Sequence, residues 1–386
     1  MTASHSSTAT SAVDASDTIL ELRNASVTYD DGESYVLDDV SIDIERNEII
    51  GIVGESGSGK SMLASALLDA IPDPGLLSGE VSYYPEGGDR VDVLDLDAAS
   101  LKELRWEEIS MVFQGAMSSF NPTMKVRGHF EETLDAHDAD RKAGMARAGE
   151  LLEDLYLDPE RVLDSYPHEL SGGMQQRALI ALSLVLEPDV LVMDEPTAAL
   201  DLLMQRSILV LLEKLQEKYD LTMVFITHDL PLVASLADRL AVMYAFELVE
   251  VGPTEEILGH ASHPYTRALL NATPNLDAPL EEMEAIEGSS PAPINVPEGC
   301  SFRPRCPLAD ESCRVDAPEH SEVVDDHTVA CHYWEESAEE IPLNYAPDGG
   351  TPDSVDTDGG TPAGVDAAGG APDGVDADGD DGGERR

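Results

Sequence analysis

Eight consecutive residues, Gly54-Glu55-Ser56-Gly57-Ser58-Gly59-Lys60-Ser61, have the types and spacing needed to hold a chain of phosphates. They fit the pattern G-x-x-x-x-G-K-[ST]. The glycines let the backbone bend so that successive N–H groups point at one phosphate chain. Lys60 would reach the β- and γ-phosphates, and Ser61 would hold Mg²⁺. This phosphate loop therefore predicts a binding site for a nucleoside triphosphate and its magnesium ion.

The elements around the phosphate loop are those that such a loop requires. The apolar run 49–53 precedes it and reads as a buried strand, and helix formers follow from Met62 to Ala70. The start of that helix adds partial positive charge and free N–H donors. The alternative, a chance Gly/Ser turn before a helix, accounts for the motif but not for this order of strand, loop and helix.

Two further apolar strands end in polar residues that could act on the phosphates. The run 190–193 ends at Asp194 and Glu195, and the run 221–226 is followed by His228. Asp194 suits a magnesium site through water, and Glu195 suits a base for an attacking water. Ligands of open α/β sheets lie at the carboxyl ends of the strands. We therefore expect these three side chains to lie beside the phosphate loop.

Three other features are weak when each is taken alone. Gln114 follows the apolar run 109–113, and Tyr29 ends an alternating strand 25 residues before Gly54. The turn Ser171-Gly172-Gly173 combines a helix N-cap with an anion-friendly backbone. A single amide, a strand aromatic and a Ser-Gly-Gly turn are usually structural, so their meaning depends on the rest of the chain.

In sequence order, these segments resemble those of the ATPase subunit of an ATP-binding cassette (ABC) transporter. The resemblance covers about residues 18–260 and includes the turn Ala199-Leu200-Asp201. It implies an α/β P-loop ATPase domain with an inserted helical subdomain at about 124–185. It also implies that Tyr29 stacks on adenine, that Gln114 serves both the magnesium site and catalysis, and that Asp201 belongs to the nucleotide site.

The same resemblance implies that two cassettes dimerise head to tail. ATP would then lie between the phosphate loop of one cassette and Ser171-Gly172-Gly173 of the other, with His228 contacting the γ-phosphate. Nucleotide binding would close the dimer and hydrolysis would open it, which couples transport to a shift between two states.

Three stretches narrow the resemblance to the oligopeptide/dipeptide (and nickel) permease branch. They are Ser118-Ser119-Phe120-Asn121-Pro122, His263-Pro264-Tyr265-Thr266 and the cysteine-bearing segment from Gly299. The chain departs from the branch at Gly115-Ala116, Leu202-Leu203 and Phe246-Glu247. The branch implies two membrane permease subunits, an extracytoplasmic solute-binding protein and a second ATPase subunit as partners. The transported solute, a peptide or a relative such as nickel, is not set by this subunit.

The four cysteines of the chain, Cys300, Cys306, Cys313 and Cys331, all lie in one short segment within the predicted C-terminal extension 261–345. The spacing lacks the C-x₂-C pair of a zinc ribbon, although four thiolates suit either an iron–sulfur cluster or zinc. Free thiols are the third alternative. The resemblance favours a [4Fe–4S] cluster. We expect this site to organise residues 299–334 without taking part in hydrolysis, and His320, His327 and His332 to lie at the surface.

Charge and composition limit the partners. The net charge is −54, and the last 41 residues, with 11 acidic and 2 basic side chains, account for only −9 of it. The remaining −45 argues against nucleic acid or an anionic membrane surface as a direct ligand. It favours a protein of a high-salt cytoplasm, where screening removes the repulsion between carboxylates. The alternative is an ordinary acidic protein.

The ends of the chain predict no folded structure. Residues 1–17 are rich in Ser, Thr and Ala and lack the basic start and apolar segment of a signal peptide. From Gly349 a ten-residue Gly/Pro/Asp repeat recurs, so we expect 346–386 to be a disordered acidic tail. No apolar run is long enough to span a bilayer. We therefore expect a cytoplasmic subunit bound to the membrane face through a permease.

Two rival functions are weaker. A soluble cassette ATPase of DNA repair or translation would resemble proteins with a long coiled-coil insertion or tandem cassettes, and the chain has neither. A redox sensor would have no use for hydrolysis, yet Glu195 and His228 are both in place.

Overall fold

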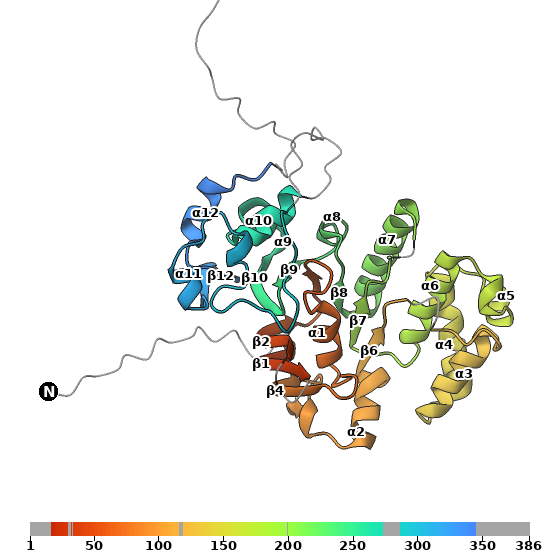
Figure 1. The fold of residues 1–386 in the computed structure, drawn as a ribbon. Coiled ribbons are helices and arrows are strands. Elements are labelled where there is room, and N and C mark those ends of the chain that lie inside the picture. The colour runs from red at the N-terminus through yellow and green to blue at the C-terminus, as the bar shows by residue number, and fades with distance from the viewer. Residues whose placement is uncertain are drawn as a thin grey trace, which may run out of the picture. The chain divides into compact units, whose positions relative to one another are not determined.

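The computed structural model describes residues 17–29, 32, 34–115, 119–198, 200–272 and 286–344 (Figure 1). These residues fall within one compact unit. The predictions for 1–16 and for the repeat tail lie outside the described residues. So do Ala116 and Ser118 of the branch motif, and Ala199 of the turn before Asp201.

A four-stranded antiparallel sheet forms one layer of the fold. Its strands run in the order β2-β1-β4-β5, with β1 Thr18–Tyr29, β2 Ser34–Glu45, β4 Leu76–Tyr83 and β5 Val91–Asp92. Alternate residues of β1, among them Leu20, Leu22 and Val27, are fully buried. This alternation is what a sheet with one covered face requires.

The second layer is an eight-stranded sheet that carries the predicted site residues at its strand ends. The order is β11-β12-β10-β9-β3-β8-β7-β6. The neighbours β9-β3-β8-β7-β6 pair in parallel. The strand bounds are β3 Ile49–Val53, β6 Ile109–Val112, β7 Val190–Asp194, β8 Thr222–Ile226, β9 Arg239–Tyr244, β10 Glu247–Pro253, β11 His320–Val324 and β12 His327–Ala330. Strands β3, β6, β7 and β8 are buried throughout, as expected for parallel strands covered on both faces.

Helix α1, Lys60–Ala66, follows the phosphate loop and packs against strands of both sheets. Its apolar residues Leu63, Ala64 and Ala66 lie in the core that joins the two sheets. The sequence predicted helix as far as Ala70. The helix instead ends at Ala66, because Asp69 takes a positive φ of 47° that an α-helix cannot contain.

Helices gather beyond β6 in a separate group, on the right in Figure 1. Phe130, Leu134, Leu151 and Leu152 are buried among them. The helices between β4 and β7 are α2 Ala98–Glu103, α3 Val126–Ala136, α4 Arg141–Asp154, α5 Pro159–Asp164 and α6 Gly172–Ser183. Helix α2 lies outside the group, and α3–α6 form it.

The C-terminal segment is built onto the large sheet. Strand β12 pairs antiparallel with β10, and β11 pairs with β12. The remaining helices are α7 Leu202–Tyr219, α8 Leu230–Ala234, α9 Thr254–His260, α10 Pro264–Asn271, α11 Ser312–Val315 and α12 Trp334–Glu340. The extension therefore shares the sheet of the ATPase fold.

One histidine prediction was wrong. His320 and His332 are exposed as expected, but His327 is completely buried. Its Nε2 lies 2.9 Å from Oε1 of the equally buried Glu250. The reason is the pairing of β12 with β10, which places the imidazole against Gly252. Sequence alone gave no sign that this histidine would lie inside a sheet.

Candidate nucleotide-binding site

Three glycines of the phosphate loop have positive φ angles, a backbone conformation that favours glycine. Gly54 has φ +152°, and a Cβ there would lie 2.2 Å from the carbonyl oxygen of Met243. Gly59 has φ +103°, and its Cβ would meet the Val36 carbonyl oxygen at 2.9 Å. Gly57 also has positive φ. The buried Ser58 hydroxyl has no hydrogen-bond partner among the described residues. The loop therefore closes tightly against β2 and β9.

Lys60 lies inside this loop. Its Nζ donates to the carbonyl oxygens of Gly54 at 2.9 Å and Glu55 at 2.8 Å. Burial lowers the pKa of Lys60, and the charges of Glu195, Asp194 and Glu55 oppose that change. The ammonium group is thus held by two backbone oxygens among three carboxylates, a position from which phosphate oxygens could take the place of the carbonyls.

Ser61 and Asp194 offer the donor set of a magnesium site. Asp194 ends β7 and is buried, and burial raises the pKa of its carboxyl group. A hydrogen bond from the Ser61 side chain opposes that rise. Oδ1 of Asp194 has no partner within the described part of the chain, which is costly for a buried carboxylate. A hard cation with oxygen ligands would satisfy it, so the residues present fit Mg²⁺.

Three predicted residues from three strand ends meet beside Lys60. His228 Nδ1 lies 2.9 Å from Oε1 of Glu195, and Gln114 Nε2 donates to Oε2 of Glu195 at 3.2 Å. They follow β8, β7 and β6, which are neighbours in the sheet. Glu195 takes a positive φ of 46°, a strained backbone for a non-glycine residue. The fold therefore orients one carboxylate with an amide and an imidazole.

The predicted residues Ser171, Gly172, Gly173 and Asp201 lie at the starts of helices α6 and α7. Ser171 caps α6 in the helical group, and a Cβ on Gly173 would meet Met204 of α7. Strands β6 and β7 stand between α6 and α1 in Figure 1. The carboxylate of Asp201 accepts from the N–H groups of Leu203 and Met204 and so caps α7. Gly172 is the first residue of α6.

Tyr29 lies at the end of β1, and its hydroxyl donates to the Pro72 carbonyl oxygen at 3.2 Å. Its ring is close to Gly75, since a Cβ there would lie 2.7 Å from the ring. The strand that pairs with β1 also supplies Val36, whose carbonyl faces Gly59. The hydroxyl end of this tyrosine therefore packs against the 72–75 turn.

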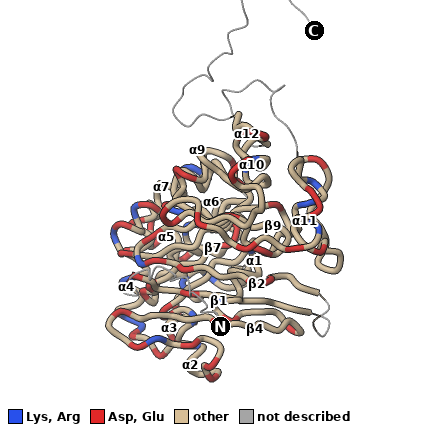
Figure 2. The backbone as a smooth tube through the Cα atoms, turned by 90° about the vertical axis from the view of Figure 1, so that its left-hand side faces the viewer, with Lys and Arg blue, Asp and Glu red and all other residues tan. Residues whose placement is uncertain are grey.

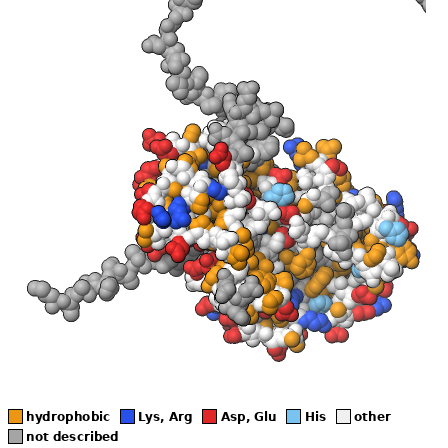
Figure 3. Space-filling view, viewed as in Figure 1, with side chains coloured by type: hydrophobic (Ala, Val, Ile, Leu, Met, Phe, Trp, Pro, Cys, Tyr) orange, Lys and Arg blue, Asp and Glu red, His pale blue; other side chains and the backbone are white. Residues whose placement is uncertain are grey.

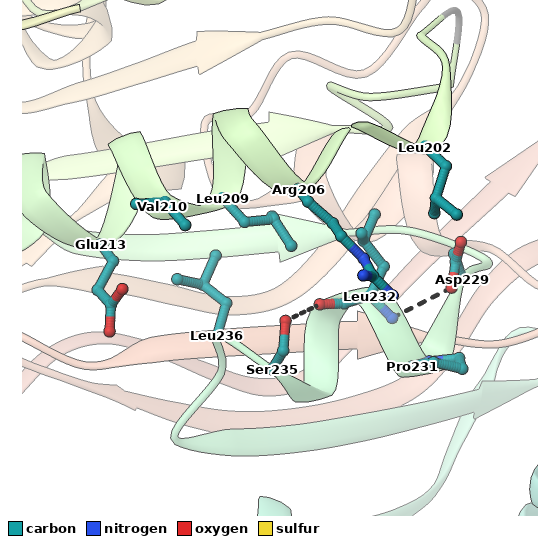
Figure 4. A pocket seen from close by; sticks show the side chains of 10 residues that line it. All are labelled: Leu202, Arg206, Leu209, Val210, Glu213, Asp229, Pro231, Leu232, Ser235 and Leu236. Carbon is teal, nitrogen blue, oxygen red and sulfur yellow. Dashed lines mark hydrogen bonds between the residues drawn. The ribbon is translucent and has the colours of Figure 1, made fainter. Parts of the chain in front are cut away.

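A pocket of about 420 Å³ lies between α7 and α8 (Figure 4). Leu202, Leu209, Leu232 and Leu236 give it an apolar lining, and Asp229 closes one end. Its lining includes no residue of the phosphate loop. This pocket is therefore separate from the phosphate loop.

The four cysteines lie close enough in the C-terminal extension for their thiols to influence one another. They carry free thiols, and Cys313 is buried while the other three are partly buried. Burial, with a contribution from neighbouring thiols, raises the pKa of Cys306 to about 11 and that of Cys331 to about 12. The N–H of Cys300 donates to the carbonyl oxygen of Cys313 at 2.8 Å.

The cysteines are not gathered around a point. Among the described residues, no group of three or more His, Cys, Asp or Glu side chains could hold one metal ion. Tetrahedral zinc with bonds of about 2.3 Å would need sulfur atoms roughly 3.8 Å apart. The arrangement therefore does not match a ready zinc site.

The cysteine segment also touches the phosphate loop, which the sequence did not predict. The guanidinium of Arg305 forms an ion pair with Glu55 at 2.9 Å. The N–H of Glu55 donates to the hydroxyl of Tyr265, also at 2.9 Å. Tyr265 belongs to the branch motif at the start of α10. These two contacts join the C-terminal extension to residue 55 of the phosphate loop.

The parallel sheet, the closed phosphate loop and the paired carboxylates at its strand ends place the chain in the class of P-loop nucleotide hydrolases. Sequence comparison narrows this class. The sequence model described as ABC transporter matches residues 37–198, and that of the oligopeptide/dipeptide transporter C-terminal region matches residues 249–313. The second match includes Tyr265, Arg305 and three of the four cysteines.

The sequences of related proteins align with this chain over most of its length. A dipeptide transport ATP-binding protein of Caldanaerobacter subterraneus subsp. tengcongensis is 42% identical over 309 residues, 79% of this chain and 93% of that protein. An oligopeptide transport ATP-binding protein of Salmonella typhimurium is 39% identical and covers 81% of this chain and 93% of its own. The chain therefore belongs to the ABC transporter family of ATP-binding proteins, in the branch with the oligopeptide/dipeptide C-terminal region.

Solved structures agree with this assignment. A dimeric ATP-binding cassette in a post-hydrolysis state, bound to ADP and Pi, has a TM-score of 0.53 and 30% identity, covering 61% of this chain and 99% of its own. A cassette from Clostridium perfringens that is part of an ABC transporter complex has a TM-score of 0.54 and 27% identity, covering 62% of this chain and 90% of its own. The predicted fold class and ATPase class are confirmed.

Proposed function

We propose that this chain is the ATPase subunit of an importer of dipeptides or oligopeptides, or of a related solute such as nickel. Two observations support this function. Glu195 is oriented by His228 and Gln114 beside Lys60, and the chain is similar over most of its length to peptide transport ATP-binding proteins.

In this function the phosphate loop residues Gly54–Ser61 bind the phosphates of ATP through backbone N–H groups and Lys60. Ser61, Asp194 and Gln114 would hold Mg²⁺, and the ion would supply neutralising charge for the transferred phosphate. Glu195 orients and deprotonates the attacking water. His228 fixes the Glu195 carboxylate and contacts the γ-phosphate. Each role assigns a chemical task to a group that the fold already places at the strand ends.

A second cassette completes the site in this proposal. Ser171, Gly172 and Gly173 lie in the helical group, away from the loop of their own chain, so they would serve the nucleotide of a partner ATPase. Asp201 would lie at the same interface, and Tyr29 would stack on adenine. The partner is either a second copy or a related subunit.

The remaining partners are two membrane permease subunits and, through them, an extracytoplasmic solute-binding protein. Within the described residues, no helix is long and apolar enough to cross a membrane. Phe113, at the end of β6, leaves 53% of its surface exposed next to the Gln114 segment and would suit a permease contact at the cytoplasmic face of the membrane. Co-purification from detergent extracts tests this. The tagged chain should bring down membrane permease subunits, and their absence from the purified material would contradict the proposal.

The cysteine segment would hold a [4Fe–4S] cluster, since its four cysteines supply the number of thiolates that such a cluster takes. Protein purified without oxygen should contain about four irons per chain and little zinc. Cys306→Ser should lose the iron and make residues 299–334 sensitive to protease, whereas Lys60→Ala should keep its iron. Stoichiometric zinc, or no metal with four reactive thiols, would contradict the cluster.

The surface charge fits a protein that works at high salt. The chain has 77 acidic and 23 basic side chains. Red acidic positions are spread over the backbone in Figure 2 and over the face seen in Figure 3. The Debye length is about 10 Å at 0.1 M salt, so neighbouring carboxylates still repel one another. At 1 M it falls to about 3 Å, and salt then screens most of this repulsion. Circular dichroism over a salt series should therefore show folding only near molar salt. A fully folded protein in dilute buffer would contradict this adaptation.

A further inference from the structure

One residue of the phosphate loop, Glu55, is held by the C-terminal segment. Arg305 contacts both of its carboxylate oxygens, Oε1 at 2.9 Å and Oε2 at 3.0 Å. The hydroxyl of Ser290 donates to Oε2 at 2.5 Å. On the backbone side, the N–H of Glu55 donates to the hydroxyl of the buried Tyr265. Three residues that lie more than 200 positions away in sequence thus fix one loop residue.

The ion pair is sheltered from water. Only 7% of the Arg305 side chain is exposed, and 24% of Glu55. The Arg305 guanidinium lies 5.7 Å from the ring centre of Tyr244 and 5.9 Å from that of Phe302, and its Nε donates to the Glu287 carbonyl at 2.8 Å. Burial alone would raise the pKa of Glu55, but hydrogen bonds from Arg305 and Ser290 outweigh it and lower the pKa. Removing one partner of such a pair leaves an uncompensated charge.

Glu55 is also directly connected to the phosphate-binding lysine. Its carbonyl oxygen accepts a hydrogen bond from Lys60 Nζ at 2.8 Å. A continuous set of contacts therefore runs from Arg305 through Glu55 to Lys60. Arg305 directly precedes Cys306, so this set of contacts begins within the cysteine segment.

We propose that Arg305 is a positioning residue of the nucleotide site, which neutralises Glu55 and holds the phosphate loop ready for ATP. The inference rests on the nucleotide site proposed above. ATP brings several negative charges to a loop that contains this carboxylate. With Arg305 in place, the pair adds no net charge near the phosphates. Without it, an unpaired carboxylate repels them and the loop loses its anchor to the extension.

The test measures the dissociation constant of ATP by titration of the full-length chain in molar salt. Arg305→Met should weaken ATP binding on the order of tenfold, a change that one charge near the phosphates can cause where burial limits its screening by salt. Arg303→Met is the matched control, because the Arg303 guanidinium donates to the Glu298 and Arg314 carbonyls of its own segment. It should bind ATP as the parent chain does. Thermal unfolding of each variant shows whether it is folded.

A second variant separates charge from general damage. Replacing Glu55 with Gln in the Arg305→Met chain removes the unpaired charge, so ATP affinity should return to within about threefold of the parent. Arg305→Gln, a polar replacement that also leaves Glu55 without its cation, should weaken ATP binding by a similar factor. This variant keeps the test decisive if Arg305→Met does not fold.

The outcomes are distinct. Unchanged affinity in a folded Arg305→Met or Arg305→Gln chain would overturn the positioning role, as would a double variant that stays weak. If the parent chain itself fails to bind ATP, the proposed function fails instead. Parent binding that Lys60→Ala abolishes, together with rescue in the double variant, would support both.

Discussion

Glu195→Gln is expected to hydrolyse ATP about 10²–10⁴-fold more slowly than the parent chain, the range for losing a general base. The amide keeps the shape of the side chain and can still contact His228 and Gln114, but it cannot take a proton from water. ATP binding should persist, because Lys60 and the loop are unchanged. The variant should therefore accumulate as an ATP-held dimer with its ATPase partner. Phosphate release and gel filtration with ATP measure both effects.

Glu187→Gln is a matched control for this experiment. Glu187 is an exposed carboxylate three residues before β7, paired with Arg147 at 3.4 Å. Its replacement should leave hydrolysis unchanged. His228→Ala should slow hydrolysis and spare binding, because it removes the imidazole that orients Glu195. A near-normal rate in Glu195→Gln would show that another group serves as the base.

Lys60→Ala is expected to abolish tight ATP binding. The ammonium group is the cation that the fold buries inside the phosphate loop, and its loss leaves Asp194 and Glu195 facing the phosphates without compensation. Nucleotide titration measures the effect, with Lys142→Ala as control, because Lys142 is exposed on α4. Unchanged affinity in Lys60→Ala would contradict the assignment of the phosphate loop.

Features written in short stretches of sequence could be predicted. Local sequence determines the phosphate loop and the apolar strands. The carboxylates that follow those strands, Asp194 and Glu195, lie beside Lys60. The family resemblance, which rested on several such stretches in order, is confirmed by the comparisons. The cysteine segment was predicted as one unit because all four thiols lie close together in the chain.

Features that depend on distant residues could not be predicted. Glu55 and Arg305 are 250 residues apart, and neither has a local pattern that names its partner. The burial of His327 follows from the pairing of β12 with β10, which no periodicity in this polar segment indicates. Tyr265 was recognised only as part of a branch motif. Its contact with the Glu55 N–H gives that motif a physical task, which is to anchor the phosphate loop to α10.

The most direct test of the account is peptide uptake by cells or membrane vesicles whose only copy of this subunit is the Glu195→Gln variant. The account predicts that ATP-dependent uptake of a labelled dipeptide or oligopeptide is lost, while the variant remains bound to its permease in the membrane fraction. Uptake at the parent rate would contradict the central claim that hydrolysis at this site powers transport.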